Sequence, residues 1–291
     1  MVKNGKGKEY NYDGKLQFEG EYLNGERNGK GKEYKYDRLE FEGEYSKGKR
    51  LKGKEYRFNN LEFEGEYLDG KRWNGKGKEY YDNGELIFEG EYLNGKRWNG
   101  KGKAYHSNVK LIFKDDYLNG ERNGKGKEYY LNGNIRYEGD YFNGKKEGNG
   151  KYIWEDGAYH IGQFKNDLPN GKGIKYYPNG SILYEGDFIN GKFEGKGKYI
   201  YDDGDYFIGE YKNGLRQGKG IGYYRNGNTM LEGEFINGKL EGNGKYIWED
   251  GKYYIGQWNN DLRNGKGTMY FSNVNIICEG GWINGKLINK R

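Results

Sequence analysis

The sequence Phe63–Lys78, FEGEYLDGKRWNGKGK, returns at Phe88–Lys103 as FEGEYLNGKRWNGKGK, with one residue changed. Each copy contains two short alternating runs. In the first run Phe63, Gly65 and Tyr67 fall on one face of an extended strand and the glutamates fall on the other, because successive strand side chains point to opposite faces. In the second run glycines alternate with lysines in the same way. Each copy is therefore predicted to form two antiparallel strands.

The central glycine of the first run marks twelve such units, spaced 22 to 25 residues apart. We interpret residues 1–291 as a single repeat array. Spacing is irregular over residues 1–138 and alternates between 23 and 24 residues over 139–291. The markers are Gly20, Gly43, Gly65, Gly90, Asp115 in the glycine position, Gly139, Gly162, Gly186, Gly209, Gly233, Gly256 and Gly280.

Turn residues separate the runs. An Asn-Gly or Asp-Gly pair joins the two strands of most units, and turns such as Asp82-Asn83-Gly84 join one unit to the next. The 54 glycines argue against helix, since each costs about 1 kcal/mol relative to alanine. The predicted fold is all-β: an elongated, single-layer antiparallel β-meander of tandem hairpins. With two strands per unit at about 4.8 Å per strand, it would be a solenoid-like rod about 110 Å long.

Composition agrees with a repeat array. Leu, Ile, Val and Phe make up less than a fifth of the chain, yet it has 32 Tyr and 6 Trp. Repeats resolve this contrast because they bury apolar surface between neighbours without a central core. The net charge of +6 is small for 291 residues and disfavours nucleic acid as a partner. A single cysteine, Cys278, and the lack of a signal peptide or a long apolar run predict a cytoplasmic protein.

One family resembles this pattern. The stretch Tyr137-Glu138-Gly139-Asp140-Tyr141, followed by Gly144, Gly148 and Gly150, is similar to the MORN (membrane occupation and recognition nexus) repeat. The resemblance implies a twisted single-layer sheet that grips extended or helical partner segments along one face. It implies a non-enzymatic protein-binding scaffold, at membrane-associated or cytoskeletal structures. The family's name also implies an alternative, peripheral binding to anionic phospholipids such as phosphoinositides.

Four positions depart from the repeat pattern. Leu51 replaces the first glycine of a Gly-x-Gly run, and Asp115 replaces a marker glycine. Val109 and Val274 occupy turn positions that elsewhere hold glycine. Because a β-branched residue resists positive φ, we expect these two turns to change type.

Repetition also argues against catalysis. Glu19 and Glu21 lie on one face at a spacing that a glycosidase could use, but the same pair recurs in unit after unit. We interpret these glutamates as cross-strand partners of the lysines. The Gly-Lys phrases lack the following Ser or Thr and the helix that a phosphate-binding loop needs.

Metal and cofactor sites are not predicted. Asp202, Asp203 and Asp205 resemble part of a calcium loop but lack its spaced ligands and final glutamate. His106 and His160 lie in different units with no cysteine nearby.

Two tryptophans are the candidate partner-binding residues. Trp73 and Trp98 are predicted to occupy loops that are one residue longer than in other units, flanked by Arg72 and Arg97. Exposed Trp and Arg side chains are typical of contact hot spots. The alternative is that each loop packs on its own sheet.

Self-association is predicted at the C-terminal edge. Ile276, Ile277, Trp282 and Ile283 belong to what we expect to be the last strand, whose unpaired edge could add a strand from a second copy to form a homodimer. The alternative is that the tail from Ile288 to Arg291 covers this edge.

Overall fold

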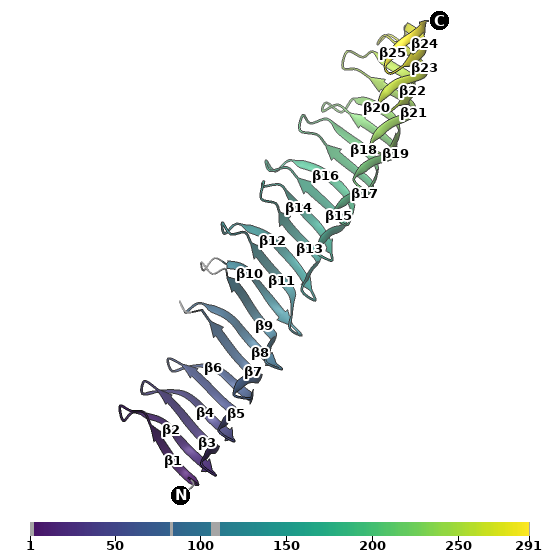
Figure 1. Cartoon of the computed structure of the whole chain (residues 1–291). Helices are drawn as coiled ribbons and strands as arrows, with labels where there is room; N and C mark the ends of the chain where they lie inside the picture. The colour runs from purple at the N-terminus through teal and green to yellow at the C-terminus, as the bar shows by residue number, and fades with distance from the viewer. Residues whose placement is uncertain (1–2, 82–83, 106–110, 291) are drawn as a thin grey trace. The chain divides into compact units, whose positions relative to one another are not determined.

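A computed structural model describes residues 3–81, 84–105 and 111–290. In these ranges the chain has 25 strands and no helix, so the all-β prediction is confirmed. The chain divides into two compact units, Met1–Gly144 and Lys145–Arg291, and Figure 1 shows consecutive strands lying side by side within each.

Each unit is an antiparallel meander in which a strand pairs with the strands before and after it, as predicted. The N-terminal unit has strands β1 (Gly5–Tyr10), β2 (Leu16–Leu23), β3 (Glu26–Lys35), β4 (Arg38–Ser46), β5 (Lys49–Arg57), β6 (Asn60–Leu68), β7 (Lys71–Tyr80), β8 (Leu86–Leu93), β9 (Lys96–Tyr105), β10 (Leu111–Leu118), β11 (Glu121–Tyr129) and β12 (Ile135–Phe142). The C-terminal unit has β13 (Lys145–Ile153), β14 (Tyr159–Lys165), β15 (Leu168–Tyr176), β16 (Ile182–Ile189), β17 (Lys192–Ile200), β18 (Tyr206–Lys212), β19 (Leu215–Tyr223), β20 (Thr229–Ile236), β21 (Lys239–Ile247), β22 (Tyr253–Asn259), β23 (Leu262–Tyr270), β24 (Ile276–Ile283) and β25 (Lys286–Lys290).

Glycines form a column across one face of the sheet, and aromatic rings cover them. Gly20, Gly31 and Gly43 are successive cross-strand partners. A Cβ added to Gly31 would lie only 2.4 Å from Cζ of Phe18, so the ring rests directly on the backbone. Glycine is required in this column because any side chain would lift the ring.

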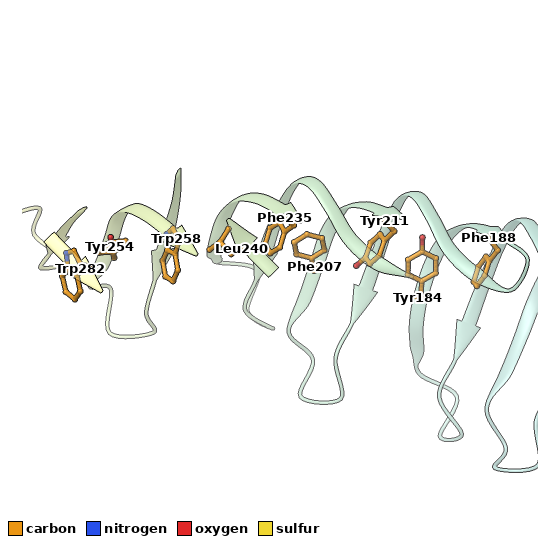
Figure 2. Close-up of a cluster of buried hydrophobic side chains, with 9 residues drawn as sticks. All are labelled: Tyr184, Phe188, Phe207, Tyr211, Phe235, Leu240, Tyr254, Trp258 and Trp282. Carbon is orange, nitrogen blue, oxygen red and sulfur yellow. The ribbon is translucent and has the colours of Figure 1, made fainter. Parts of the chain in front are cut away.

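The rings interlock along this aromatic face. Phe18 contacts Tyr22 of its own strand and Tyr45 of the next hairpin in edge-on geometry, with ring centroids 5.6 and 5.1 Å apart. Phe41 repeats the arrangement with Tyr45 and Tyr67. Such pairs contribute about 0.5–1.5 kcal/mol each beyond the area they bury. Figure 2 shows the corresponding cluster of the C-terminal unit, where the labelled side chains follow one another along the sheet.

The turns confirm the predicted Asn-Gly hairpins but not the predicted change of turn type at Val274. Asn24 and Gly25 both have positive φ, 53° and 86°, as a two-residue Asn-Gly hairpin requires. Val274 keeps the left-handed conformation, with φ 69°, and its N–H donates to the Phe271 carbonyl at 3.1 Å as the equivalent glycines do. The prediction that this turn changes type is therefore wrong. Val109 lies outside the described residues.

The C-terminal strand order corrects the predicted edge. Ile276, Ile277, Trp282 and Ile283 lie on β24, which pairs with β23 on one side and with β25 on the other. Trp282 is buried, and its indole N–H donates to the Gly267 carbonyl at 3.1 Å. We missed β25 because its five residues lack the glycine-lysine alternation. The tail thus covers the part of the expected edge from Gly280 to Ile283, while Ile276 and Ile277 lie beyond its pairing. Self-association at this edge stays a prediction.

Candidate binding surface

The opposite face of the N-terminal unit carries charge. From β1 to β9 the odd-numbered strands contribute lysines and the even-numbered strands contribute glutamates, which meet across the strands as predicted. On β10 the pattern breaks, because Lys114 takes a glutamate position and pairs with Lys103 and Lys127. Ion pairs join Lys8 to Glu19 at 3.3 Å and Lys78 to Glu89 at 2.9 Å. These pairs are exposed, and each contributes at most about 1 kcal/mol. The charged face therefore adds little to stability and is open to contact.

A groove of about 990 Å³ runs over this face from β1 to β6. Its floor is the backbone of the column glycines, and two rows of charged side chains form its walls. One row includes Lys6, Glu21 and Lys30, and the other includes Lys8 and Glu19. A smaller hollow of about 570 Å³ lies over β6 to β9. An extended or helical segment lying across the strands would contact both rows.

Trp73 and Trp98 lie in strands β7 and β9, not in loops, which corrects the prediction. The extra residue changes the register. In an ordinary hairpin one glycine of the strand pairs with the column glycines of both neighbouring strands. In β7, Gly75 pairs with Gly65 of β6 and Gly77 pairs with Gly90 of β8. The inserted residue therefore shifts the pairing register of β7 by two residues between its two neighbouring strands.

Both tryptophans are partly buried against the turn of the next hairpin. The Trp73 carbonyl accepts the Gly95 N–H at 2.8 Å, and a Cβ on Gly95 would lie 3.5 Å from the Trp73 ring. Trp98 and Gly120 repeat this contact. The six-membered ring of each indole therefore packs on a turn of its own sheet, and the side chain as a whole stays partly exposed. Partner binding by these residues stays a prediction.

Arg72 and Arg97 are engaged within the sheet. The Arg72 guanidinium lies 2.8 Å from Glu55 and 2.9 Å from Glu62, and it stacks over the ring of Phe63. Arg97 is equivalent: it pairs with Glu79 at 2.6 Å and stacks over Phe88. Burial opposes ionisation of Glu79, but hydrogen bonds from Arg97 and Tyr92 outweigh it and lower its pKa. The predicted role of these arginines beside the tryptophans is not supported by their contacts.

A family model for the MORN repeat matches nine segments between residues 18 and 273. The segments are 18–38, 63–85, 116–135, 137–159, 160–182, 184–206, 207–229, 232–253 and 254–273. The chain belongs to the MORN repeat family. Our count of twelve units is higher because the units that contain Gly43, Gly90 and Gly280 are not matched. No curated protein matches the chain.

One MORN unit carries a buried carboxylate where the others carry the column glycine. Asp115 pairs with Gly102 and Gly126 across the strands, and its side chain is fully buried. Its Oδ2 lies 3.1 Å from Nη1 of Arg122, at ion-pair distance, but neither carboxylate oxygen has a partner at hydrogen-bond geometry. Burial raises the pKa of Asp115 to about 6, although Arg122 opposes the rise.

A second MORN unit carries a histidine in the ring position. His160 is buried beneath Phe188, whose ring centroid lies 4.6 Å away, and neither imidazole nitrogen has a hydrogen-bond partner. Burial, together with the charge of Lys175, lowers the pKa of His160 to about 4. The imidazole is therefore neutral at pH 7 and acts as a covering ring.

The residues tested for metal and membrane chemistry give no site within the described ranges. No group of His, Cys, Asp and Glu there could hold a metal ion. Asp203 accepts the Asp205 N–H at 3.0 Å, which is an ordinary turn contact. In the same ranges the chain contains no helix that is long and apolar enough to cross a bilayer.

Proposed function

We propose that this MORN protein is a non-enzymatic protein-binding scaffold whose charged face holds a partner segment, at membrane-associated or cytoskeletal structures of the cytoplasm. The groove over β1 to β6 carries this proposal. The groove is open to solvent, and the backbone of the column glycines forms its floor. The aromatic rings that stabilise the fold lie on the other face of the sheet.

The charges of the groove favour a polypeptide over a lipid surface. Six lysines and five glutamates line it, so the two signs nearly cancel. Anionic headgroups are attracted by uncompensated positive charge, which this groove lacks. A polypeptide segment with charges of both signs can match the alternating rows.

The test compares three forms of the chain as bait in a native cytosolic extract. The groove variant carries Lys30→Gln, Lys32→Gln, Glu42→Gln and Glu44→Gln. The control carries the same kind of change at exposed strand ends outside the groove: Glu26→Gln, Lys71→Gln, Lys96→Gln and Glu121→Gln. We expect proteins recovered by the native and control chains to be lost with the groove variant.

Equal recovery by all three baits would contradict the proposed site. Flotation with phosphatidylcholine vesicles, with and without phosphatidylinositol 4,5-bisphosphate, tests the lipid alternative. We expect no flotation with either composition, and flotation that requires the phosphoinositide would assign the face to lipid instead.

A further inference from the structure

The charged face changes its pattern in the C-terminal unit. Cross-strand partners there form a continuous row that reads Lys151, Ile161, Ile174 and Glu185 over β13 to β16. The same order recurs 47 residues later. It reads Lys198, Ile208, Ile221 and Glu232 over β17 to β20, and it begins again at Lys245 on β21.

Three isoleucines of this row, Ile161, Ile208 and Ile255, are exposed, whereas Ile174 and Ile221 are half-buried. Ile208 is 45% exposed and Ile255 is 47% exposed. Beside Ile208 and Ile221 the rings of Tyr206 and Tyr223 stack with centroids 4.8 Å apart. Each four-strand period therefore presents an apolar patch, and the periods are about 19 Å apart. Recurring exposed apolar patches mark an interaction surface.

Glu185 of this row is not held in an ion pair with its cross-strand lysine. In the N-terminal unit Lys32 forms an ion pair with the cross-strand Glu42. In the described part of the C-terminal unit, Glu185 and Lys198 are cross-strand neighbours that form no ion pair. The Lys198 ammonium instead lies 4.2 Å from the centre of the Tyr206 ring. Glu185 is exposed and is available to a second molecule.

The order of the row is self-complementary. Read backwards, Lys-Ile-Ile-Glu becomes Glu-Ile-Ile-Lys. A two-fold axis parallel to the strands, between β18 and β19, would turn a second copy over and reverse its row. Ile208 would then face Ile221 of the second copy, Lys198 would face its Glu232, and Glu185 would face its Lys245.

The row of charged residues on the other side of the glycine column is self-complementary about the same two-fold axis. On β18 and β19 Glu210 would face Lys219, and Lys196 of β17 would face Glu234 of β20. Among the described residues of these two rows, no position brings like charges together. Both rows are thus self-complementary about one two-fold axis, which is what an isologous interface requires.

We propose that the C-terminal unit binds a second copy of this chain, face to face and antiparallel, about an axis between β18 and β19. Sheets of one twist pack face to face with strands aligned to within about 30°. Twelve strands give a row about 50 Å long, and a contact about 15 Å wide along it would bury roughly 800 Å² on each copy. Stable dimers bury this area. The inference is separate from the proposed function, which uses the N-terminal unit.

The test is a charge exchange, measured by light scattering on the full chain at about 50 μM. One variant carries Glu185→Lys and Glu232→Lys, and the other carries Lys198→Glu and Lys245→Glu. In each variant alone, like charges would meet across the axis. In the mixture every new charge would meet its opposite.

We expect the native chain to be a dimer, each variant to be a folded monomer by circular dichroism, and an equal mixture to regain twice the mass of one chain. A control with Glu19→Lys and Glu42→Lys on the N-terminal unit should stay dimeric. A native monomer, a dimer that persists in both single variants, or a mixture that stays monomeric would overturn the proposal.

A variant that fails to fold is replaced by Ile208→Gln with Ile221→Gln, which alters the centre without adding charge and should also be monomeric. The groove variant of the proposed function should remain a dimer, so failure of one proposal is distinguishable from failure of the other.

Discussion

Replacing Asp115 by glycine should stabilise the protein at neutral pH. Asp115 interrupts the glycine column, and its carboxylate lies over Gly126, where a ring lies in neighbouring hairpins. Phe113 is consequently only partly buried, whereas Phe18 and Phe88 are fully buried. With glycine at position 115, the Phe113 ring is free to close over the column.

Three contributions set the expected change in the free energy of unfolding on Asp115→Gly. A pKa of about 6, against 3.8 for the free group, corresponds to about 3 kcal/mol of destabilisation at pH 7. Fuller burial of the Phe113 ring adds about 1 kcal/mol, and the backbone freedom of glycine removes about 1 kcal/mol. After allowance for relaxation around the carboxylate, we expect a gain of about 2 kcal/mol. Because the folded pKa is raised, the native chain recovers stability as pH falls from about 6 towards 4, and the gain should shrink over that window.

Urea unfolding at pH 7 and pH 4.5, followed by tyrosine and tryptophan fluorescence, measures this difference. Asp115→Asn serves as the control, because it removes the charge without freeing space for the Phe113 ring, and it should give a smaller gain. A glycine variant that is no more stable than the native chain at pH 7, or a gain that does not depend on pH, would refute the reasoning.

Three further changes should follow from single contacts. His160→Tyr should raise the urea midpoint, and it should remove the loss of stability that we expect as pH falls from 6.5 towards 4, since the folded pKa of His160 is lowered; an unchanged pH profile would contradict this. Val274→Gly should stabilise by about 1 kcal/mol in the same assay by relieving positive φ at an exposed position, and a loss of stability would show that the valine is not strained there. Trp73→Ala with Trp98→Ala should cost about 1–2 kcal/mol, because both rings pack on turns, and should reduce partner recovery from extract; full recovery would remove them from the binding surface.

Much of the fold could be predicted from local pattern. Alternation in Phe18-Glu19-Gly20-Glu21-Tyr22 places the rings and the charges on opposite faces without any knowledge of partners. The Asn24-Gly25 pair specifies its own turn, because both residues tolerate positive φ. These features depend only on neighbours in sequence.

Features that depend on register could not be predicted in the same way. The insertion at Trp73 is visible in the sequence, but its conversion into a two-residue step requires knowing which glycine pairs with Gly65. The engagement of Arg72 with Glu55 likewise spans 17 residues. The self-complementary row around Ile208 was missed because its members come from different strands and appear together only in the paired sheet.

Aromatic rings packed on bare glycines hold the fold together, which leaves the charged face free for contact. Urea unfolding of two variants tests it most directly: Gly31→Ala on the aromatic face, and the groove variant with Lys30, Lys32, Glu42 and Glu44 changed to glutamine. The added methyl would meet Phe18 at 2.4 Å, and we expect it to cost about 2 kcal/mol. The four neutralised charges should together cost about 1 kcal/mol or less. A groove variant that loses more stability than Gly31→Ala would contradict the account.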